Sequence, residues 1–443
     1  MTDCKSCPSS DQLLFPFAGR RRVTVTCDED ELSNDAGVLL LRRVDEGFGL
    51  TAALAGALAE WRNPVFVVHS LHDLVRERVF AIAQGYEDGN DAQRIRNDTL
   101  FKIACGRSAD GVELASQPSI SRFENIAGRD GLVAAKDVLL DHFIRKNQRR
   151  LRRSGRLVLD MDTTDDPTHG QQEFAFFNGY YDSYCYQELL IHTEDGDLLW
   201  CELLSGTDDA RRPALRALTH VGERLRQAWP HVTLALRADA GFAGPELYDY
   251  CEDEHVEYAV NGGTHKPWKD RIAPLLERAE SLHQASSATA PAQVFGEFEY
   301  QAKSWRQPRR IVAKAQRTLV GPDERFLVTN SKSTPDAVYD WYAGRGQEEN
   351  WIKDLKRGLK SDRLSCSSHN ANELRLVLFC VAYQLMHELR RLLPSEPSLQ
   401  LETLRLRLLR VAARVQITAR RVWVRLSRAY PWRHLWHRVV AHP

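Results

Sequence analysis

The segment Arg156-Leu157-Val158-Leu159-Asp160-Met161-Asp162 marks the point at which the hydrophobic period of this 443-residue chain changes. Before it, apolar residues recur mainly at helical spacing, most regularly over residues 132–146. The segment itself is a short apolar run that ends in an acid, which is typical of a buried strand. Further strand patterns and then strand–helix alternation follow it, so we expect an α/β fold with helices packed on a mixed sheet.

Changes of pattern divide the chain into five expected regions. Strand patterns at 294–302, 310–317 and 325–329 follow a Ser/Ala/Thr-rich stretch at 281–292, which we expect to be a loop. We interpret this part as a small β insertion, and from Pro335 the pattern is helical again. The expected regions are a mainly helical N-terminal domain at 1–150, a first part of the α/β core at 151–261, the β insertion at 262–334, a second part of the core at 335–393 and a basic helical C-terminal segment at 394–443.

Basic residues are unevenly distributed along the chain. Lys and Arg together number 60, as do Asp and Glu, so the net charge alone argues against an anionic partner. However, seven of the twelve residues from Arg145 to Arg156 are basic, and Leu401 to Pro443 holds ten Arg and one acid. Such local density is typical of a protein that binds a polyanion. A solvated basic face remains the alternative for either run.

The chain carries no sign of membrane insertion or export. Its longest apolar run, residues 376–386, is too short to span a bilayer, and its polar N-terminus lacks the apolar core of a signal peptide. We therefore expect a cytoplasmic protein. Nine cysteines fit free thiols in a reducing compartment. Cys4 and Cys7 form a C-x-x-C pair, but no second pair follows, which favours a disordered tail over a zinc site.

A predicted helix late in the chain carries an unusual polar stripe. Tyr342, Arg345, Glu349 and Lys356 are separated by three, four and seven residues, which places them on one helical face, and Lys353 joins them. A structural helix buries apolar residues on its stripe instead. The alternative is a solvated helix with ion pairs between Glu349 and Lys353 and between Arg345 and Glu349.

Two acids at strand ends are candidates to join Glu349. Asp162 closes the apolar run described first, and Asp239 follows the predicted strand at 232–237. The carboxyl ends of strands are where open α/β sheets place their sites. Asp239 also lies too early to cap the next helix, whose first turn is marked by Pro245. Asp160 shares a strand face with Asp162 and competes with it for the same role.

Three carboxylates without an activated nucleophile fit one chemistry well. Two hard cations, Mg²⁺ or Mn²⁺ in its place, are bound by carboxylate oxygens and stabilise the attacking and leaving oxygens at phosphorus. Such a site also needs cations near the phosphates, and Arg345, Lys353 and Lys356 are candidates.

These residues together resemble a known family. The spacing Tyr342-x2-Arg345-x3-Glu349-x6-Lys356 is similar to the Tyr-Arg-Glu-Lys motif of bacterial insertion-sequence transposases that use a DDE triad. Asp162-Thr163-Thr164 resembles the first-aspartate motif of that group, and residues 237–242 resemble the second. The motifs occur in the family's order and cover nearly half of the chain. The resemblance implies an RNase H-like fold and cut-and-paste transposition, in which DNA ends are cleaved and joined to target DNA.

The resemblance also implies roles for individual residues. Asp162, Asp239 and Glu349 would be the catalytic metal ligands, and Tyr342, Arg345 and Lys356 would contact phosphates of the transposon end. An insertion-domain Trp stacks on a flipped base in related enzymes, and Trp305 is the candidate here, with packing on its own insertion as the alternative.

Partners and rival functions follow from the same resemblance. Paired double-stranded DNA ends imply a homodimer in the DNA complex, and the helical N-terminal domain is a candidate for binding them. Two alternatives stay open: an RNase H-like nuclease that cuts without joining, and a DNA-binding protein without catalysis. The presence of all three acids argues against the second of these.

Overall fold

The computed structural model describes most of the chain. The described residues are 13–15, 23–25, 32–60, 62–126, 128–151, 155–285, 292–318, 321–393 and 399–441. Cys4 and Cys7, and two arginines of the first basic run, Arg152 and Arg153, lie outside these ranges. Among the described residues, no helix has both the length and the apolar character needed to cross a bilayer.

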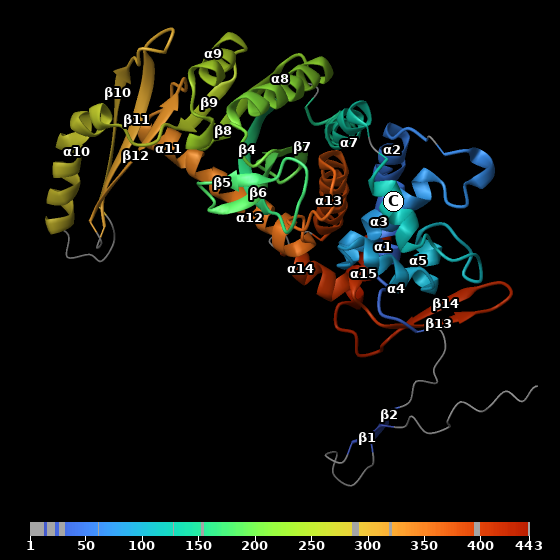
Figure 1. The fold of residues 1–443 in the computed structure, drawn as a ribbon. Helices are drawn as coiled ribbons and strands as arrows, with labels where there is room; N and C mark the ends of the chain where they lie inside the picture. The colour runs from blue at the N-terminus through green and yellow to red at the C-terminus, as the bar shows by residue number, and fades with distance from the viewer. Residues whose placement is uncertain are drawn as a thin grey trace, which may run out of the picture.

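A nine-stranded mixed sheet forms the centre of the molecule (Figure 1). Within it the strands β7-β6-β4-β8-β9 lie side by side, with β4, β8 and β9 parallel and with β6 and β7 antiparallel to their neighbours. This order and these directions are compatible with the RNase H-like core that the resemblance implies. The strands are β4 (Gly155–Pro167), β5 (Phe176–Asn178), β6 (Ser183–Thr193), β7 (Leu198–Leu204), β8 (Val232–Ala238) and β9 (Glu257–Asn261).

Strand β4 presents two chemically different faces. Leu157, Leu159 and Met161 point into the apolar core beneath α8 (Arg211–Ala228) and α9 (Pro245–Asp253). Because side chains alternate along a strand, Asp160 and Asp162 lie on the opposite face, toward α12 (Glu348–Lys353). The short apolar run therefore supplies core packing and, on its other side, a row of acids.

The insertion is continuous with the central sheet. Strands β10 (Ala292–Tyr300), β11 (Arg309–Arg317) and β12 (Pro322–Thr329) form a meander, and β12 pairs with β9. The three predicted strands are therefore confirmed, but the interpretation as a small β insertion is incomplete. A 20-residue helix, α10 (Lys266–Ala285), precedes them and extends into the expected loop. It forms because Trp268, Ile272 and Ala279 make a buried stripe at helical spacing.

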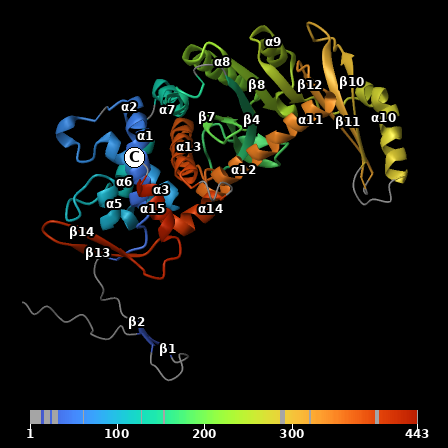
Figure 2. The same ribbon diagram turned by 180° about the vertical axis from the view of Figure 1, so that it is seen from behind.

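The expected helical N-terminal region packs beside the sheet, at the end opposite to the insertion (Figures 1 and 2). Helix α13 (His369–Arg391) stands between them and is buried on all sides, which explains its long apolar run. Helix α11 (Pro335–Ala343) leads into α12. The N-terminal helices are α1 (Val38–Phe48), α2 (Leu50–Ala57), α3 (Leu71–Gln84), α4 (Ala92–Ile95), α5 (Thr99–Ala104), α6 (Gln117–Glu124) and α7 (Arg129–Asn147).

The C-terminal segment corrects the expectation of a helical region at 394–443. It contains α14 (Leu401–Leu404) and α15 (Arg433–Ala441), but between them β13 (Ala413–Ile417) and β14 (Val422–Leu426) form a hairpin. The hairpin forms because apolar and polar residues alternate there with a period of two, which is a strand pattern. β13 also pairs with β3 (Leu32–Ser33), and β1 (Leu13–Phe15) pairs with β2 (Val23–Val25).

Candidate active site

The parallel pair β4–β8 brings two of the predicted acids together. The paired register runs through Asp160–Arg237 and Met161–Ala238, and β8 then ends. Asp239 follows directly, so it lies beside Asp162 at the edge of the sheet. As expected, Asp239 does not cap α9, whose N-cap is Gly244; instead its Oδ1 accepts a hydrogen bond of 2.9 Å from the Gly241 amide at a short 3₁₀ turn before that helix. Its other oxygen faces the site.

Arg345 stands between these two acids. One terminal nitrogen of its guanidinium, Nη2, lies 2.8 Å from Oδ2 of Asp162 and 3.9 Å from Oδ2 of Asp239. Arg345 follows α11 in a short 3₁₀ turn at Gly344–Gln347, which points the side chain back at the sheet edge. The ion pair between Arg345 and Glu349, which belonged to the solvated-helix alternative, is replaced by this contact with the strand acids.

Two adjacent glutamates on α12 have opposite environments. Glu349, the predicted third acid, has a side chain that is 62% exposed, and its Oε2 lies 3.8 Å from Nζ of Lys353. Glu348 is fully buried, with one oxygen 3.4 Å from Nδ1 of His192 and the other 4.0 Å from Nε of Arg345. Glu349 therefore lies at the solvent side of the site, and Glu348 lies behind it.

Glu348 and His192 were not anticipated from the sequence. The only available signal was the spacing of three residues between Arg345 and Glu348, which puts them on neighbouring positions of a helix. His192 gave no signal, because it lies 156 residues away and reads as part of a strand.

Asp160, the competitor of Asp162, is fully engaged elsewhere. Its two oxygens each accept a hydrogen bond of 2.6 Å from the Arg237 guanidinium, which also donates to the Trp341 carbonyl at 2.8 Å. A bidentate pair of this kind holds both carboxylate oxygens in place. Asp160 thus ties β4 to β8 and to the end of α11, whereas Asp162 faces Arg345.

Burial and like charges dominate the electrostatics of the site. Burial raises the pKa of Asp162 to about 6, with further upward contributions from Asp239 and Glu349, while Arg345 opposes the shift. Burial likewise raises the pKa of Tyr342 to about 12, and Arg345, Asp239 and Asp162 are its charged neighbours. Three negative groups therefore share a region with one cation between them.

The donor set fits a divalent cation in its chemistry. Carboxylate oxygens are hard ligands of the kind that Mg²⁺ and Mn²⁺ prefer, and an added positive charge would offset both the burial of Asp162, which is the main cause of its raised pKa, and the smaller repulsion from Asp239 and Glu349. Among the described residues, no three His, Cys, Asp or Glu side chains yet converge closely enough to ligate one ion. Asp162, Asp239 and Glu349 are the residues that would hold it.

Lys356 is bound to the protein itself. Its ammonium donates to Oγ1 of Thr164 at 3.1 Å and to the carbonyl and Oδ1 of Asp165 at 2.6 and 2.9 Å. Two fully buried acids, Asp166 and Glu188, lie close enough for its charge to act on them. In this arrangement Lys356 anchors the turn after α12 to β4, whereas Lys353 is exposed.

Trp305 is half-buried between the insertion and α9 of the core. Its ring makes edge contacts with Tyr248 and Tyr300, at centroid distances of 5.6 and 5.9 Å, and lies near Trp268. The Arg309 guanidinium is 5.3 Å from the same ring. The packing alternative given for Trp305 therefore describes its environment here.

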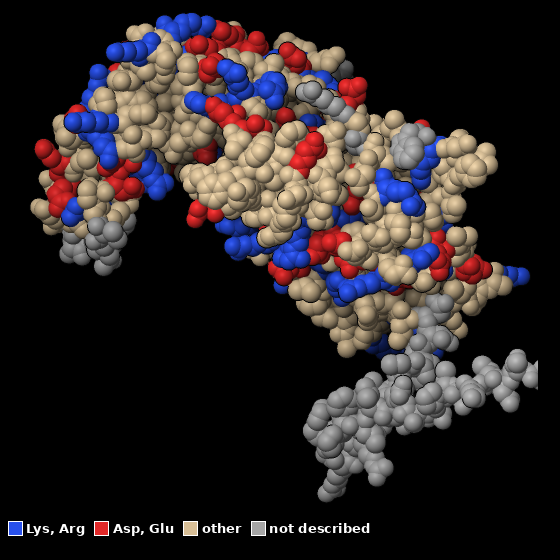
Figure 3. All heavy atoms as spheres, in the orientation of Figure 1, with Lys and Arg blue, Asp and Glu red and all other residues tan. Residues whose placement is uncertain are grey.

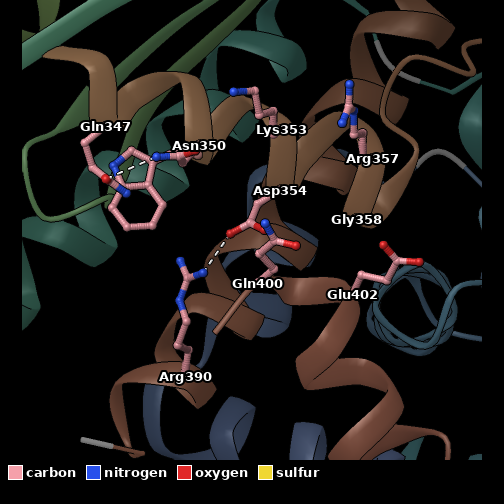
Figure 4. Close-up of a pocket in the computed structure, with 10 residues that line it drawn as sticks. Gln347, Asn350, Lys353, Asp354, Arg357, Gly358, Arg390, Gln400 and Glu402 are labelled. Atoms are coloured by element: carbon pink, nitrogen blue, oxygen red, sulfur yellow. Dashed lines mark hydrogen bonds and ion pairs between the residues drawn. The ribbon is translucent and has the colours of Figure 1, made fainter. Parts of the chain in front are cut away.

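A polar pocket lies beside α12 (Figure 4). Its lining includes Lys353, Arg357 and the buried ion pair between Asp354 and Arg390, whose atoms are 2.7 Å apart. None of Asp162, Asp239 and Glu349 lines it. Lys and Arg side chains gather on the surface over α12 and α14 (Figure 3), so the helix that carries Glu349 is flanked by positive charge.

Comparison with known proteins agrees with this geometry. No curated protein matches the sequence significantly. Residues 15–442 match the family described as transposase DDE domain group 1, which is nearly the whole chain. Members of such families transpose DNA by cleaving and joining it, with the help of divalent metal ions. The chain therefore belongs to the DDE transposases of this group.

Proposed function

We propose that this chain is an insertion-sequence transposase of the Tyr-Arg-Glu-Lys group, which cuts the ends of its element and joins them to target DNA. The observation that carries the proposal is the juxtaposition of Asp162, within β4, and Asp239, directly after the end of β8, with Arg345 between them. Glu349 on α12 faces the same region from the solvent side.

The proposed catalytic groups are Asp162, Asp239 and Glu349, which would hold two Mg²⁺ ions. Bound there, the ions would supply the positive charge that favours in-line attack by water or a 3′-hydroxyl at phosphorus. Arg345 has two functions in this proposal. It neutralises the strand acids, and it offers its guanidinium to a DNA phosphate once the acids have another cation.

Tyr342 and Lys356 have different support as phosphate contacts. The Tyr342 hydroxyl stays protonated at neutral pH, because its pKa is about 12, so it is a hydrogen-bond donor to phosphate. Lys356 is already bound to Thr164 and Asp165, so we assign it to positioning the helix instead. Lys353, exposed beside Glu349, is the better candidate for direct contact.

The test uses the DNA that flanks the gene. Fragments with inverted repeats near both ends of the coding region are incubated with the protein and Mg²⁺, and the products are sequenced. Pre-cut ends with a 3′-hydroxyl are offered together with a target plasmid, because joined products separate a transposase from a nuclease that only cuts. Without Mg²⁺, and with excess chelator, we expect neither product; Mn²⁺ restores both.

Substitutions at the acids identify the site. We expect Asp162→Asn, Asp239→Asn and Glu349→Gln each to lower cleavage at least about a hundredfold, since a catalytic metal contributes several kcal/mol and each tenfold change is about 1.4 kcal/mol. DNA binding should be retained. Survival of cleavage in all three variants contradicts the assignment.

Glu348→Gln is the matched control for Glu349→Gln. It changes a carboxyl group one residue away, which faces His192, is shielded from solvent and has its pKa raised well above the usual range by burial. We expect a smaller loss, about tenfold to a hundredfold, of the size seen when a supporting group behind a metal ligand is changed. If Glu348→Gln abolishes cleavage and Glu349→Gln does not, Glu348 is the third ligand.

A further inference from the structure

The hairpin β13–β14 has one face that is packed and one that is open. Ala413 and Val415 are buried, and their partners Leu426 and Val424 pack against the same core. The base of the hairpin is fixed by β3, which pairs with β13 at Ala413 and Arg414. Beyond that pairing the hairpin extends away from the helices, as both ribbon views show (Figures 1 and 2).

The open face carries a compact set of polar and aromatic side chains. Arg414 lies opposite Arg425, and Gln416 lies opposite Trp423, and all four are exposed. The guanidinium carbons of Arg421 and Arg425 each lie 5.8 Å from the Trp423 ring, which is 45% exposed. The four-residue turn that includes Arg420 is closed by hydrogen bonds between Thr418 and Arg421, so these side chains project from a defined backbone.

The charge on this face is not balanced within the hairpin. Like charges directly opposite each other on two strands destabilise the pairing, yet Arg414 and Arg425 occupy such positions. The sequence from Thr403 to Pro443 contains no Asp or Glu. Among the described residues, Arg420, Arg421 and Arg425 form no ion pair with a carboxylate. These three arginines therefore carry charge that an anionic partner would neutralise.

The shape of the hairpin selects among anionic partners. The major groove of B-form DNA admits a two-stranded β-ribbon, and Arg and Gln are side chains that hydrogen-bond there to guanine and adenine edges as well as to phosphates. From these observations we infer that the open face of β13–β14 binds double-stranded DNA, with the ribbon lying in a groove and Arg420, Arg421 and Arg425 contacting phosphates or base edges. The inference rests on the proposed function, because it gives a DNA-processing chain a second contact outside its active site.

The experiment measures DNA affinity against salt concentration. A fluorescently labelled duplex of about 30 base pairs from the element's end is titrated with Asp239→Asn protein, which removes cleavage from the measurement. Because each phosphate contact contributes about 0.9 to the slope of log affinity against log salt, Arg420→Ala/Arg421→Ala/Arg425→Ala should lower that slope by about two to three. Its thermal unfolding should match that of the parent.

The matched control removes the same charge elsewhere. Arg211 and Arg306 are exposed and Arg226 is half-buried, and they are paired with Asp209, Asp253 and Glu254, respectively. Their triple Ala variant should keep the parental slope. We call the Arg420→Ala/Arg421→Ala/Arg425→Ala protein the ribbon variant. An equal decrease of the salt slope in the ribbon variant and in the control variant, or no decrease in the ribbon variant, overturns the inference. If the ribbon variant alone changes molecular mass in solution and keeps its affinity, the face is an interface with a second copy of the chain, which also overturns it.

Two further measurements separate the possible failures. Arg420→Glu alters only the exposed turn, so it remains informative if the triple variant does not fold; it should weaken binding at least tenfold, and unchanged affinity contradicts the inference. Cleavage of uncut end fragments is then assayed at saturating protein, in chains that keep Asp239. Normal cleavage by the ribbon variant supports a contact separate from catalysis, whereas loss of catalysis in a variant that still binds places these arginines in the active complex and overturns it.

Discussion

The two basic runs of this chain look alike in sequence and differ in structure. In the first run, Arg145 to Arg156, Lys146 contacts Asp197 and lies 2.6 Å from Glu388, Arg150 pairs with Asp195, and Arg156 pairs with Glu257. In the second run, the hairpin β13–β14 presents arginines in a stretch of sequence without acids. Local basic density is equal evidence of polyanion binding in both, but Lys146, Arg150 and Arg156 of the first run contact acids, whereas Arg420, Arg421 and Arg425 of the second have no carboxylate partner among the described residues.

This difference shows that acids elsewhere in the fold decide whether the basic side chains of a run are available to an external anion. The acids that neutralise the first run lie 45 to 242 residues away along the chain, on other elements of the fold. No sequence window around the run contains them. The first run therefore joins α7 to the sheet and to α13, while the second remains suited to an external anion.

The largest expected effect, on the free energy of unfolding, comes from removing Glu388, the acid on α13 that Lys146 of the first run contacts. Glu388 accepts hydrogen bonds from His142, Lys146 and Gln384, at 2.9, 2.6 and 2.9 Å. Glu388→Ala leaves these partners buried without their anion, which typically costs about 3–5 kcal/mol in free energy of unfolding. Urea denaturation measures it, with Glu254→Ala as an exposed control that should lose less than about 1 kcal/mol. A loss below 1 kcal/mol for Glu388→Ala would mean that the run is not structural.

The buried network around Glu388 should also make the free energy of unfolding depend on pH, which we do not expect of the hairpin β13–β14. Burial, aided by Arg391 and Arg390, lowers the pKa of His387 to about 3, so this side chain is neutral when folded and gains a proton on unfolding below pH 6.5. As the pH falls from 7 toward 3, the unfolded state binds the extra proton and stability decreases. Linkage gives a loss of about 2 kcal/mol by pH 5 from this residue. His387→Gln should make the decline between pH 7 and 5 shallower by that amount, and an unchanged slope contradicts it.

A substitution at Lys146 sharpens the contrast between stability and binding. Lys146→Met keeps the aliphatic stem and removes the ammonium, and Asp197 retains Arg391 as a partner, with both carboxylate oxygens 2.9 Å from it. We expect a loss of about 1–2 kcal/mol in stability and an unchanged salt slope for DNA binding. The ribbon variant should show the opposite result, with unchanged stability and a lower salt slope. Lys146→Arg serves as the conservative control, and a salt slope lowered by about one in Lys146→Met would assign this residue to DNA instead.

The sequence was sufficient for features that depend on neighbouring residues. Strand periodicity located β4, β8 and the strands of the insertion, and the strand-end rule selected Asp162 and Asp239 from 60 acids. It could not show that Arg345 stands between these two, that Asp160 is held by Arg237, or that Trp305 is packed against Tyr248. Each of these depends on which elements meet in three dimensions. The hairpin was missed for a different reason, since its apolar residues also fit an amphipathic helix.

The smallest expected effect lies at the exposed end of the first run. Arg150 and Asp195 are 3.2 Å apart with side chains 61% and 48% exposed, so their pair contributes no more than about 1 kcal/mol to stability. Asp195→Asn removes the acid and keeps the shape. If pairing with acids keeps the first run from binding DNA, Asp195→Asn makes Arg150 available to a phosphate. The variant should then unfold at the same denaturant concentration as the parent, and its salt slope for DNA binding should rise by up to about one. Asp209→Asn, which frees Arg211 from a comparable exposed pair on α8, is the control for a general gain in positive charge. A steeper salt slope in both variants would result from the change in net charge alone. An unchanged slope in both variants would mean that Arg150 does not contact DNA, so that the DNA contacts are limited to the hairpin β13–β14 and the active site.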